Sequence, residues 1–163
     1  MKTLFLALRS VVYMTGFILF FAWIALRVRV LDQYFGSSIP AVIKLPGAIV
    51  AVLGALLVLA CAGTFILWGR GTPAIFDAPR DFVAVGPYRY VRNPMYIGGL
   101  MLLIGGGLYL RSITILFLAL LLSVILHFFV LFYEEPTLTR KFGSSYLEYL
   151  RSVRRWIPGW PSA

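Results

Sequence analysis

The sequence is poor in cysteine and in charge. Its 163 residues include one cysteine, Cys61, so no disulfide can form within the chain and nothing points to an oxidising compartment. Charged residues make up 13% of the chain, and only six of them are Asp or Glu. This composition excludes a disordered or fibrous protein, because disordered chains combine low hydrophobicity with high charge. The sequence also contains no repeat, low-complexity tract or heptad pattern.

Apolar residues are abundant. They form 61% of the chain, against roughly 45–50% in soluble domains, and a single soluble domain could not cover so much apolar surface. The fold class predicted is all-α: a polytopic integral membrane protein with one domain over residues 1–163. The net charge of +9 would suggest nucleic acid as a partner of a soluble chain. In a membrane protein it is better explained by basic residues near lipid headgroups, so no nucleic acid is expected.

Four apolar runs predict four transmembrane helices, at about residues 4–26, 45–68, 95–110 and 113–133. The first is too long for a signal-peptide core and is taken as a retained span. The glycine triplet 105–107 weakens the far end of the third, and Glu134 and Glu135 are expected to end the fourth. Residues 69–93, with three prolines, form a loop, or a fifth span if they dip into the membrane. Small residues of the second run should allow close helix contacts: Gly47, Ala48, Ala51, Gly54, Ala55 and Ala62.

Basic residues orient these spans. With four spans, both termini, the 69–93 loop and the tail lie on one side, which carries all of the 15 Lys and Arg except Arg27, Arg29, Lys44 and Arg111. The positive-inside rule makes that side cytoplasmic. In a bacterium the membrane would be the inner or plasma membrane.

The tail after Pro136 has the pattern of an interfacial amphipathic helix. Its apolar residues recur at steps of three and four and fall on one face: Leu138, Phe142, Tyr146, Tyr149 and Val153. Gly143 is expected to break this helix in two. Ser145 and Glu148 fit a capping box that starts the second half, and Trp156 and Trp160 resemble interfacial anchors.

Two polar clusters stand at the cytoplasmic ends of spans. The first is the pair Glu134 and Glu135, which either forms ion pairs with Arg89, Arg92 or Arg140, or lines a pocket for a cationic ligand. The second is residues 86–98, GPYRYVRNPMYIG, just before the third span. Asn93 fits the N-cap of that helix and Pro94 its first turn, and such a helix start suits a carboxylate or phosphate.

These clusters resemble a family of membrane methyltransferases that includes isoprenylcysteine carboxyl methyltransferase and phosphatidylethanolamine N-methyltransferase. The resemblance spans about residues 63–158 and rests on three strings in order: residues 86–98, the Glu134-Glu135-Pro136 step, and Phe142-Gly143 followed by Tyr146, Tyr149 and Ile157-Pro158. It implies that S-adenosylmethionine is bound by the C-terminal half at the cytoplasmic membrane face. It also implies a lipid or lipidated acceptor that enters from the bilayer.

The resemblance also implies cofactor-binding residues. Five fall on the family's Arg-His-Pro-x-Tyr-x-Gly segment and two on its acidic pair, while the others follow from the tail tyrosines and a glycine-bearing segment: Arg92, Asn93, Pro94, Tyr96, Gly98, Glu134, Glu135, Tyr146, Tyr149, Gly69 and Gly71. Asn93 stands where the carboxyl methyltransferases have His, and it matches the phospholipid N-methyltransferases. A phospholipid amine is therefore the favoured acceptor, with a prenylcysteine-type carboxylate as the alternative.

Methyl transfer requires collinear donor and acceptor in a dry pocket and needs no metal, so no metal site is predicted. An amine acceptor must be neutral to attack, which asks for a base: Glu135 is the first candidate and His127 the second, although His127 also fits a buried, hydrogen-bonded histidine. A carboxylate acceptor needs no base, and Arg89 would position it. Two other interpretations stay open, an NADPH-dependent reductase of the sterol-reductase type and a non-enzymatic membrane scaffold.

Overall fold

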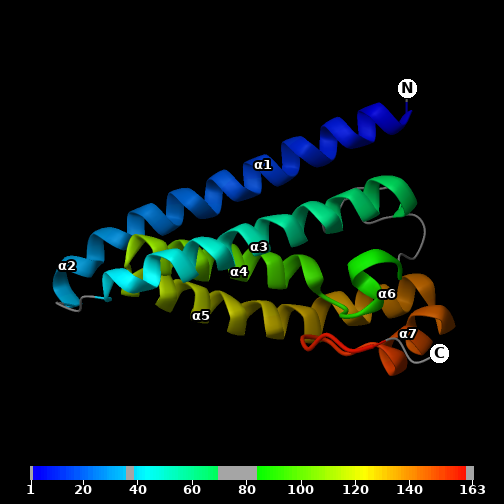
Figure 1. Ribbon diagram of the computed structural model, residues 1–163. Coiled ribbons are helices and arrows are strands. Elements are labelled where there is room, and N and C mark those ends of the chain that lie inside the picture. The colour runs from blue at the N-terminus through cyan, green and yellow to red at the C-terminus, as the bar shows by residue number, and fades with distance from the viewer. Residues whose placement is uncertain (1, 36–38, 70–83, 161–163) are drawn as a thin grey trace.

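The structure is a computed structural model that describes residues 2–35, 39–69 and 84–160, and within these ranges it contains helices and no strand. The expected all-α fold is confirmed for this part of the chain. Four long helices lie side by side (Figure 1): α1 (Lys2–Val28), α3 (Lys44–Thr64), α4 (Pro94–Leu110) and α5 (Ile113–Phe129). They correspond to the four apolar runs, with ends that differ by a few residues.

Short helices occupy the two ends of this bundle. The N-terminus, α6 (Glu135–Phe142) and α7 (Ser144–Ser152) lie at one end, and α2 (Asp32–Phe35) lies at the other (Figure 1). Consecutive long helices run in opposite directions between these ends. The remaining elements are single turns: η1 (Arg29–Leu31), η2 (Ala41–Ile43), η3 (Phe65–Gly69), η5 (Gly86–Arg89) and η6 (Val130–Glu134).

The closest helix contact joins α3 and α4 through glycines. A Cβ on Gly54 would lie 2.6 Å from the carbonyl oxygen of Gly98, and a Cβ on Gly105 would lie 2.6 Å from the carbonyl oxygen of Gly47. In each helix the two glycines are seven residues apart, so they recur on one face. The backbones therefore touch without intervening side chains. The expected packing role is confirmed for Gly47 and Gly54.

Apolar side chains of the long helices remain exposed. Two helical stretches, Ala41–Leu67 and Ile113–Phe142, are long and apolar enough to cross a membrane, and Pro94–Leu110 is apolar but shorter. Only 28% and 17% of the apolar windows in the two longer stretches is buried. A core helix of a soluble protein would be mostly buried, so the exposed apolar surface is compatible with contact to lipid.

The end of α5 nearest α2 is held by polar side chains. The Ser112 hydroxyl accepts a hydrogen bond from the Ile115 amide at 3.2 Å and forms the N-cap of α5. The Asp32 carboxylate accepts two more, from the Thr114 amide at 3.0 Å and the Thr114 hydroxyl at 2.8 Å. Burial acts to raise the pKa of Asp32, but hydrogen bonds from Ser112 and Thr114 and the nearby charge of Arg29 outweigh it and lower the pKa.

Two expectations about helix ends were wrong. Glu134 and Glu135 do not end the fourth helix, because α5 continues through the π-helical turn η6 into α6. The glycine triplet does not weaken the third helix, which runs to Leu110; a Cβ on Gly107 would lie within 3.0 Å of Ile115 and Leu116, so α5 packs against that end. Most of the expected loop lies outside the described residues, as does any fifth span within residues 70–83.

The tail folds largely as its pattern predicts. Gly143, with a φ of 60°, separates α6 from α7, and a left-handed backbone of this kind favours glycine. Tyr146, Tyr149 and Val153 form a buried cluster against which Leu138 and Phe142 pack. The capping box was wrong: the Ser145 hydroxyl donates to the carbonyl oxygen of Phe142 at 2.8 Å, and Gly143 at the N-cap of α7 offers no side chain.

Candidate functional site

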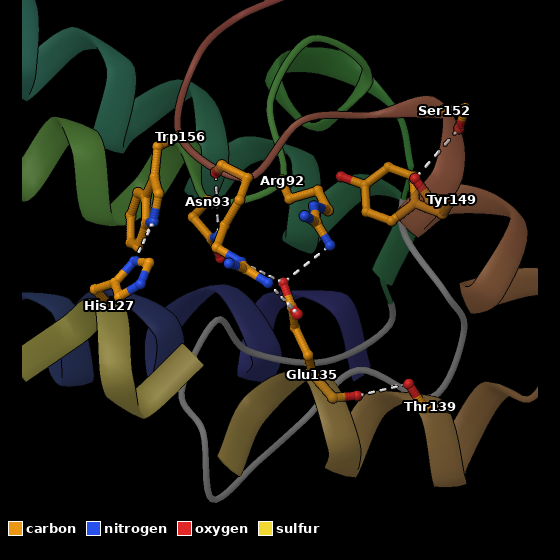
Figure 2. A network of polar contacts seen from close by, with 9 residues as sticks. Arg92, Asn93, His127, Glu135, Thr139, Tyr149, Ser152 and Trp156 are labelled. Carbon is orange, nitrogen blue, oxygen red and sulfur yellow. Dashed lines mark hydrogen bonds and ion pairs between the residues drawn. The ribbon is translucent and has the colours of Figure 1, made fainter. Parts of the chain in front are cut away.

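Glu135 lies between two arginines that come from distant parts of the chain (Figure 2). Arg155 Nε and Nη2 lie 2.8 Å from Glu135 Oε1 and Oε2, respectively, and Arg92 Nη1 lies 2.9 Å from Oε1. The side chains of Arg92 and Glu135 are each 12% exposed, and that of Arg155 is 24% exposed. Paired arginine forks of this kind are strong and directional. The hydrogen bonds to Glu135 raise the pKa of Arg155.

Hydrogen bonds join two of the chain segments that meet at this network, the start of α4 and the C-terminal segment. The Arg92 amide donates to the Arg154 carbonyl at 2.9 Å, and the Asn93 side-chain amide donates to the Arg155 carbonyl at 3.2 Å. Asn93 occupies the N-cap of α4, as predicted, but makes no side-chain cap there. Its amide instead fastens the C-terminal segment to the start of α4.

Glu134 has a different environment from Glu135. Its Oε2 accepts a hydrogen bond from the Tyr96 hydroxyl at 2.9 Å, and no arginine among the described residues forms an ion pair with it. Tyr96 belongs to the first turn of α4 and Glu134 to the last residue of η6. π-Helical turns inside longer helices often occur at functional sites. The two neighbouring carboxylates thus differ: two arginines pair with Glu135, whereas Glu134 has no cationic partner in the described part of the chain.

One buried polar atom near this network lacks a partner. Arg92 Nε is buried and makes no hydrogen bond within the described part of the chain. Buried donors are usually satisfied, because leaving one unpaired costs about 1–3 kcal/mol. The N–H of Arg92 is therefore available to an acceptor from outside the chain.

Three buried tyrosines lie near this network: Tyr88 of η5, and Tyr146 and Tyr149 of α7. The Tyr149 hydroxyl donates to the Tyr88 carbonyl at 2.7 Å, which joins α7 to η5. Burial raises the pKa of all three tyrosines. The carboxylates of Glu135 and Glu134 raise the pKa of Tyr146 further, whereas Arg92 and Arg155 oppose them, so Tyr146 lies in the field of the whole network.

The other residues expected from the sequence lie elsewhere. His127 Nδ1 accepts a hydrogen bond from Trp156 Nε1 at 3.0 Å (Figure 2), which is the hydrogen-bonded arrangement considered for it. Arg89 is exposed and makes no ion pair with Glu135. Gly98 packs against α3, where a Cβ would lie 2.8 Å from Val58 Cγ2. Gly69 ends η3, and Gly71 lies outside the described residues.

Sequence reasoning missed Arg155 and the contact of Trp156. Arg155 was treated only as one of many cytoplasmic cations, and Trp156 as an interfacial anchor. No local pattern marks either role, because both depend on the C-terminal segment folding back over α4 and α5. Of the three arginines named as partners of the acidic pair, the described structure pairs Arg92 with Glu135, while Arg89 and Arg140 form no such pair.

Comparison with known families agrees with this geometry. The sequence profile described as phospholipid methyltransferase matches residues 42–145, well over half of the chain. The chain belongs to the phospholipid methyltransferase family. The matched range includes α3, α4, α5, both carboxylates and Arg92, whereas Arg155 and Trp156 follow it. No curated protein matches the chain. The expected family is thus confirmed, and membership points to a methyltransferase with lipid-like substrates.

Proposed function

We propose that this phospholipid methyltransferase family member transfers the methyl group of S-adenosylmethionine to a lipid acceptor at the cytoplasmic membrane face, with a phospholipid amine as the favoured acceptor. The observation that carries the proposal is that the adjacent carboxylates Glu134 and Glu135 have different partners. Glu135 is held by Arg92 and Arg155, while the partner of Glu134 among the described residues is the Tyr96 hydroxyl. A site of this kind offers both signs of charge to one small ligand.

The residues fit S-adenosylmethionine at both ends of its methionine part. The unpartnered N–H of Arg92 suits the carboxylate, and Glu134 suits a cationic group. When bound, the cofactor supplies a methyl group on a positively charged sulfur. Tyr146 and Tyr149, both buried, would cover the ligand and exclude water, which strengthens each charged interaction.

The structure changes which carboxylate we favour as the base for an amine acceptor. Glu135 already accepts two hydrogen bonds from Arg155 and forms an ion pair with Arg92, so both of its oxygens are engaged by guanidiniums. Glu134 is next to it, and no described residue binds its Oε1, so we assign Glu134 the task of taking the proton or stabilising the cation. Glu135 then acts by positioning Arg92. His127 shares its Nδ1 with Trp156 and is a weaker candidate.

The membrane arrangement is part of the proposal. A single membrane domain over residues 1–163 would place α1, α3, α4 and α5 across the bilayer, with the cofactor-binding half at about residues 63–158. Because most basic residues belong to the end of the bundle that holds α6, α7 and the N-terminus, that end is assigned to the cytoplasm. The acceptor would then reach the carboxylates at headgroup level.

The test is calorimetric titration of purified, detergent-solubilised protein with S-adenosylmethionine, its demethylated product and NADPH. Binding of the methyl donor and product without NADPH binding, followed by incorporation of radiolabelled methyl into membrane lipids, is the expected result. Folded protein that binds NADPH alone would replace this proposal with a reductase. Folded protein that binds none of the three would leave the scaffold interpretation.

A further inference from the structure

A polar cavity lies beside the Glu135 network, between η5 and the C-terminal segment. It has a volume of about 380 Å³ and is lined by Arg89, Tyr90, Ser152, Arg154, Gly159 and Trp160, among others. Small-molecule sites usually span roughly 300–1,000 Å³. Neither Glu134 nor Glu135 lines this cavity. It is therefore a separate space from the proposed cofactor site.

The cavity carries positive charge that the described chain does not neutralise. Arg89 and Arg154 are both exposed, and among residues 2–35, 39–69 and 84–160 neither forms an ion pair. No carboxylate belongs to its lining. Two guanidiniums facing one space repel each other, and an anion between them would relieve that repulsion. Arginine forks match the oxygens of a phosphate better than a point charge does.

Hydrogen bonds hold the walls of this cavity in place. The Gly159 amide donates to the Tyr90 carbonyl at 2.8 Å, and the Arg92 amide donates to the Arg154 carbonyl at 2.9 Å. The rings of Tyr90 and Trp160 lie 5.8 Å apart between centroids. The two arginines are therefore carried on segments that are already joined, which lowers the cost of organising them around a ligand.

The cavity and the methyl-transfer site share one chain segment. Arg154 lines the cavity, while its neighbour Arg155 binds Glu135. Val153, just before them, has an extended backbone with φ of −120° and ψ of 133°, and in extended chain successive side chains point to opposite sides. The same few residues thus lie between this cavity and the acidic pair. Tyr90 and Trp160 give the cavity the aromatic residues typical of headgroup level.

We propose that this cavity binds a phosphate group through Arg89 and Arg154, and that the phosphate is the one in the headgroup of the phospholipid acceptor. The assignment to the acceptor rests on the proposed function. The phosphate chemistry itself rests only on the cavity, and a soluble phosphate would satisfy the same two arginines. A carboxylate acceptor would have no such group, so the cavity favours a phospholipid over a prenylcysteine.

The test uses the full chain in a detergent without phosphate and short-chain phosphatidylethanolamine as the titrant. Diacylglycerol with the same acyl chains is the matched ligand that lacks phosphate, and inorganic phosphate is the soluble competitor. The variants are Arg89→Gln with Arg154→Gln, and Arg151→Gln is the control because Arg151 is an exposed arginine of α7 that does not line the cavity.

The double variant should bind the phospholipid at least about tenfold more weakly, while Arg151→Gln and the wild type bind alike. Diacylglycerol should bind weakly to every protein. Equal phospholipid affinity in the double variant and the wild type, or equal affinity for diacylglycerol and phospholipid, would overturn the proposal. Binding of inorganic phosphate that phospholipid does not displace would overturn the assignment to a headgroup.

Titration with S-adenosylmethionine on the same proteins separates this proposal from the function. Loss of phospholipid affinity in the double variant, with no cofactor binding to any protein, would support the phosphate site and refute the methyltransferase. Cofactor binding and methyl transfer that persist at the wild-type KM for phospholipid in the double variant would support the methyltransferase and refute the phosphate site.

Discussion

Arg155 donates hydrogen bonds to both carboxylate oxygens of Glu135, with its Nε 2.8 Å from Oε1 and its Nη2 2.8 Å from Oε2. The two residues are twenty positions apart and come from a helix start and from the C-terminal segment. The pair therefore joins the C-terminal segment to the point where η6 passes into α6. Its disruption should affect both the fold and the site.

Glu135→Gln should weaken S-adenosylmethionine binding at least about tenfold and lower the free energy of unfolding by about 2 kcal/mol, while the protein still folds. The reason is that Arg92 and Arg155 would lose their shared counter-charge. Titration calorimetry and thermal unfolding in detergent measure the two effects. Glu148→Gln, which removes an exposed carboxylate of α7, is the control. Wild-type affinity in Glu135→Gln would refute its positioning role.

Glu134→Gln should weaken binding of the positively charged methyl donor more than binding of the uncharged-sulfur product. Gln keeps an oxygen that can accept the Tyr96 hydrogen bond, so the change removes charge and little else. The ratio of the two affinities, measured by titration, is the readout. Tyr96→Phe should change both affinities by similar, smaller factors. A ratio unchanged by Glu134→Gln would mean that this carboxylate does not face the cation.

Gly105→Ala should destabilise the protein by about 1–3 kcal/mol, because the new methyl group would meet the backbone of α3. Gly106→Ala is the matched control, since nothing lies within 4 Å of a Cβ at that position. In a helix, glycine to alanine alone should stabilise slightly. Thermal unfolding in detergent compares the two. Equal midpoints for both variants would contradict the contact between α3 and α4.

His127→Gln should retain S-adenosylmethionine binding and most methyl transfer, because Gln can still accept a hydrogen bond from Trp156. His127→Leu should lower the free energy of unfolding by about 1 kcal/mol, since the Trp156 N–H would lose its acceptor. Activity against a phospholipid amine and thermal unfolding are the measurements. Abolished turnover with intact cofactor binding in His127→Gln would restore His127 as the base.

Asp32→Ala should destabilise the protein near pH 7 by about 1 kcal/mol, as the loss of a helix cap does. The pKa of Asp32 in the fold lies below its usual 3.8. Its contribution is therefore present above the unfolded pKa and is lost as the pH falls through the folded pKa. Unfolding midpoints of wild type and variant should converge as the pH is lowered below 3.8 and through the folded pKa. A gap that stays constant with pH would contradict the charged hydrogen bonds to Thr114.

Local patterns in the sequence predicted the helices, the break at Gly143 and the place of Asn93 at the start of α4. They succeeded because hydrophobic periodicity, glycine and proline act over a few residues. The partner of Asn93 was not predictable, since its amide binds the Arg155 carbonyl from the far end of the chain. The family resemblance supplied the residues of the acidic pair, but only the fold shows that two arginines pair with Glu135 while no described arginine pairs with Glu134.

The expectation that Glu134 and Glu135 end their helix failed for the same reason. Two adjacent charges at the end of an apolar run usually mark the edge of a span, and the pattern contains no sign of their partners. In the structure Arg92 and Arg155 neutralise Glu135, and Tyr96 binds Glu134, so the helix continues past both. A local rule could not detect these partners, because Tyr96 lies 38 positions before Glu134 and Arg155 lies 20 positions after Glu135.

The glycine contacts of α3 and α4 also limit where a lipid acyl chain can pass between the helices. Where a single methyl group cannot fit between two backbones, an acyl chain cannot pass. Under the proposed function, a lipid whose headgroup reaches Glu134 would therefore approach along another flank of the bundle. Because α3 and α4 leave no gap at these glycines, the entry path of such a lipid would lie beside α1 or α5, which pack less closely.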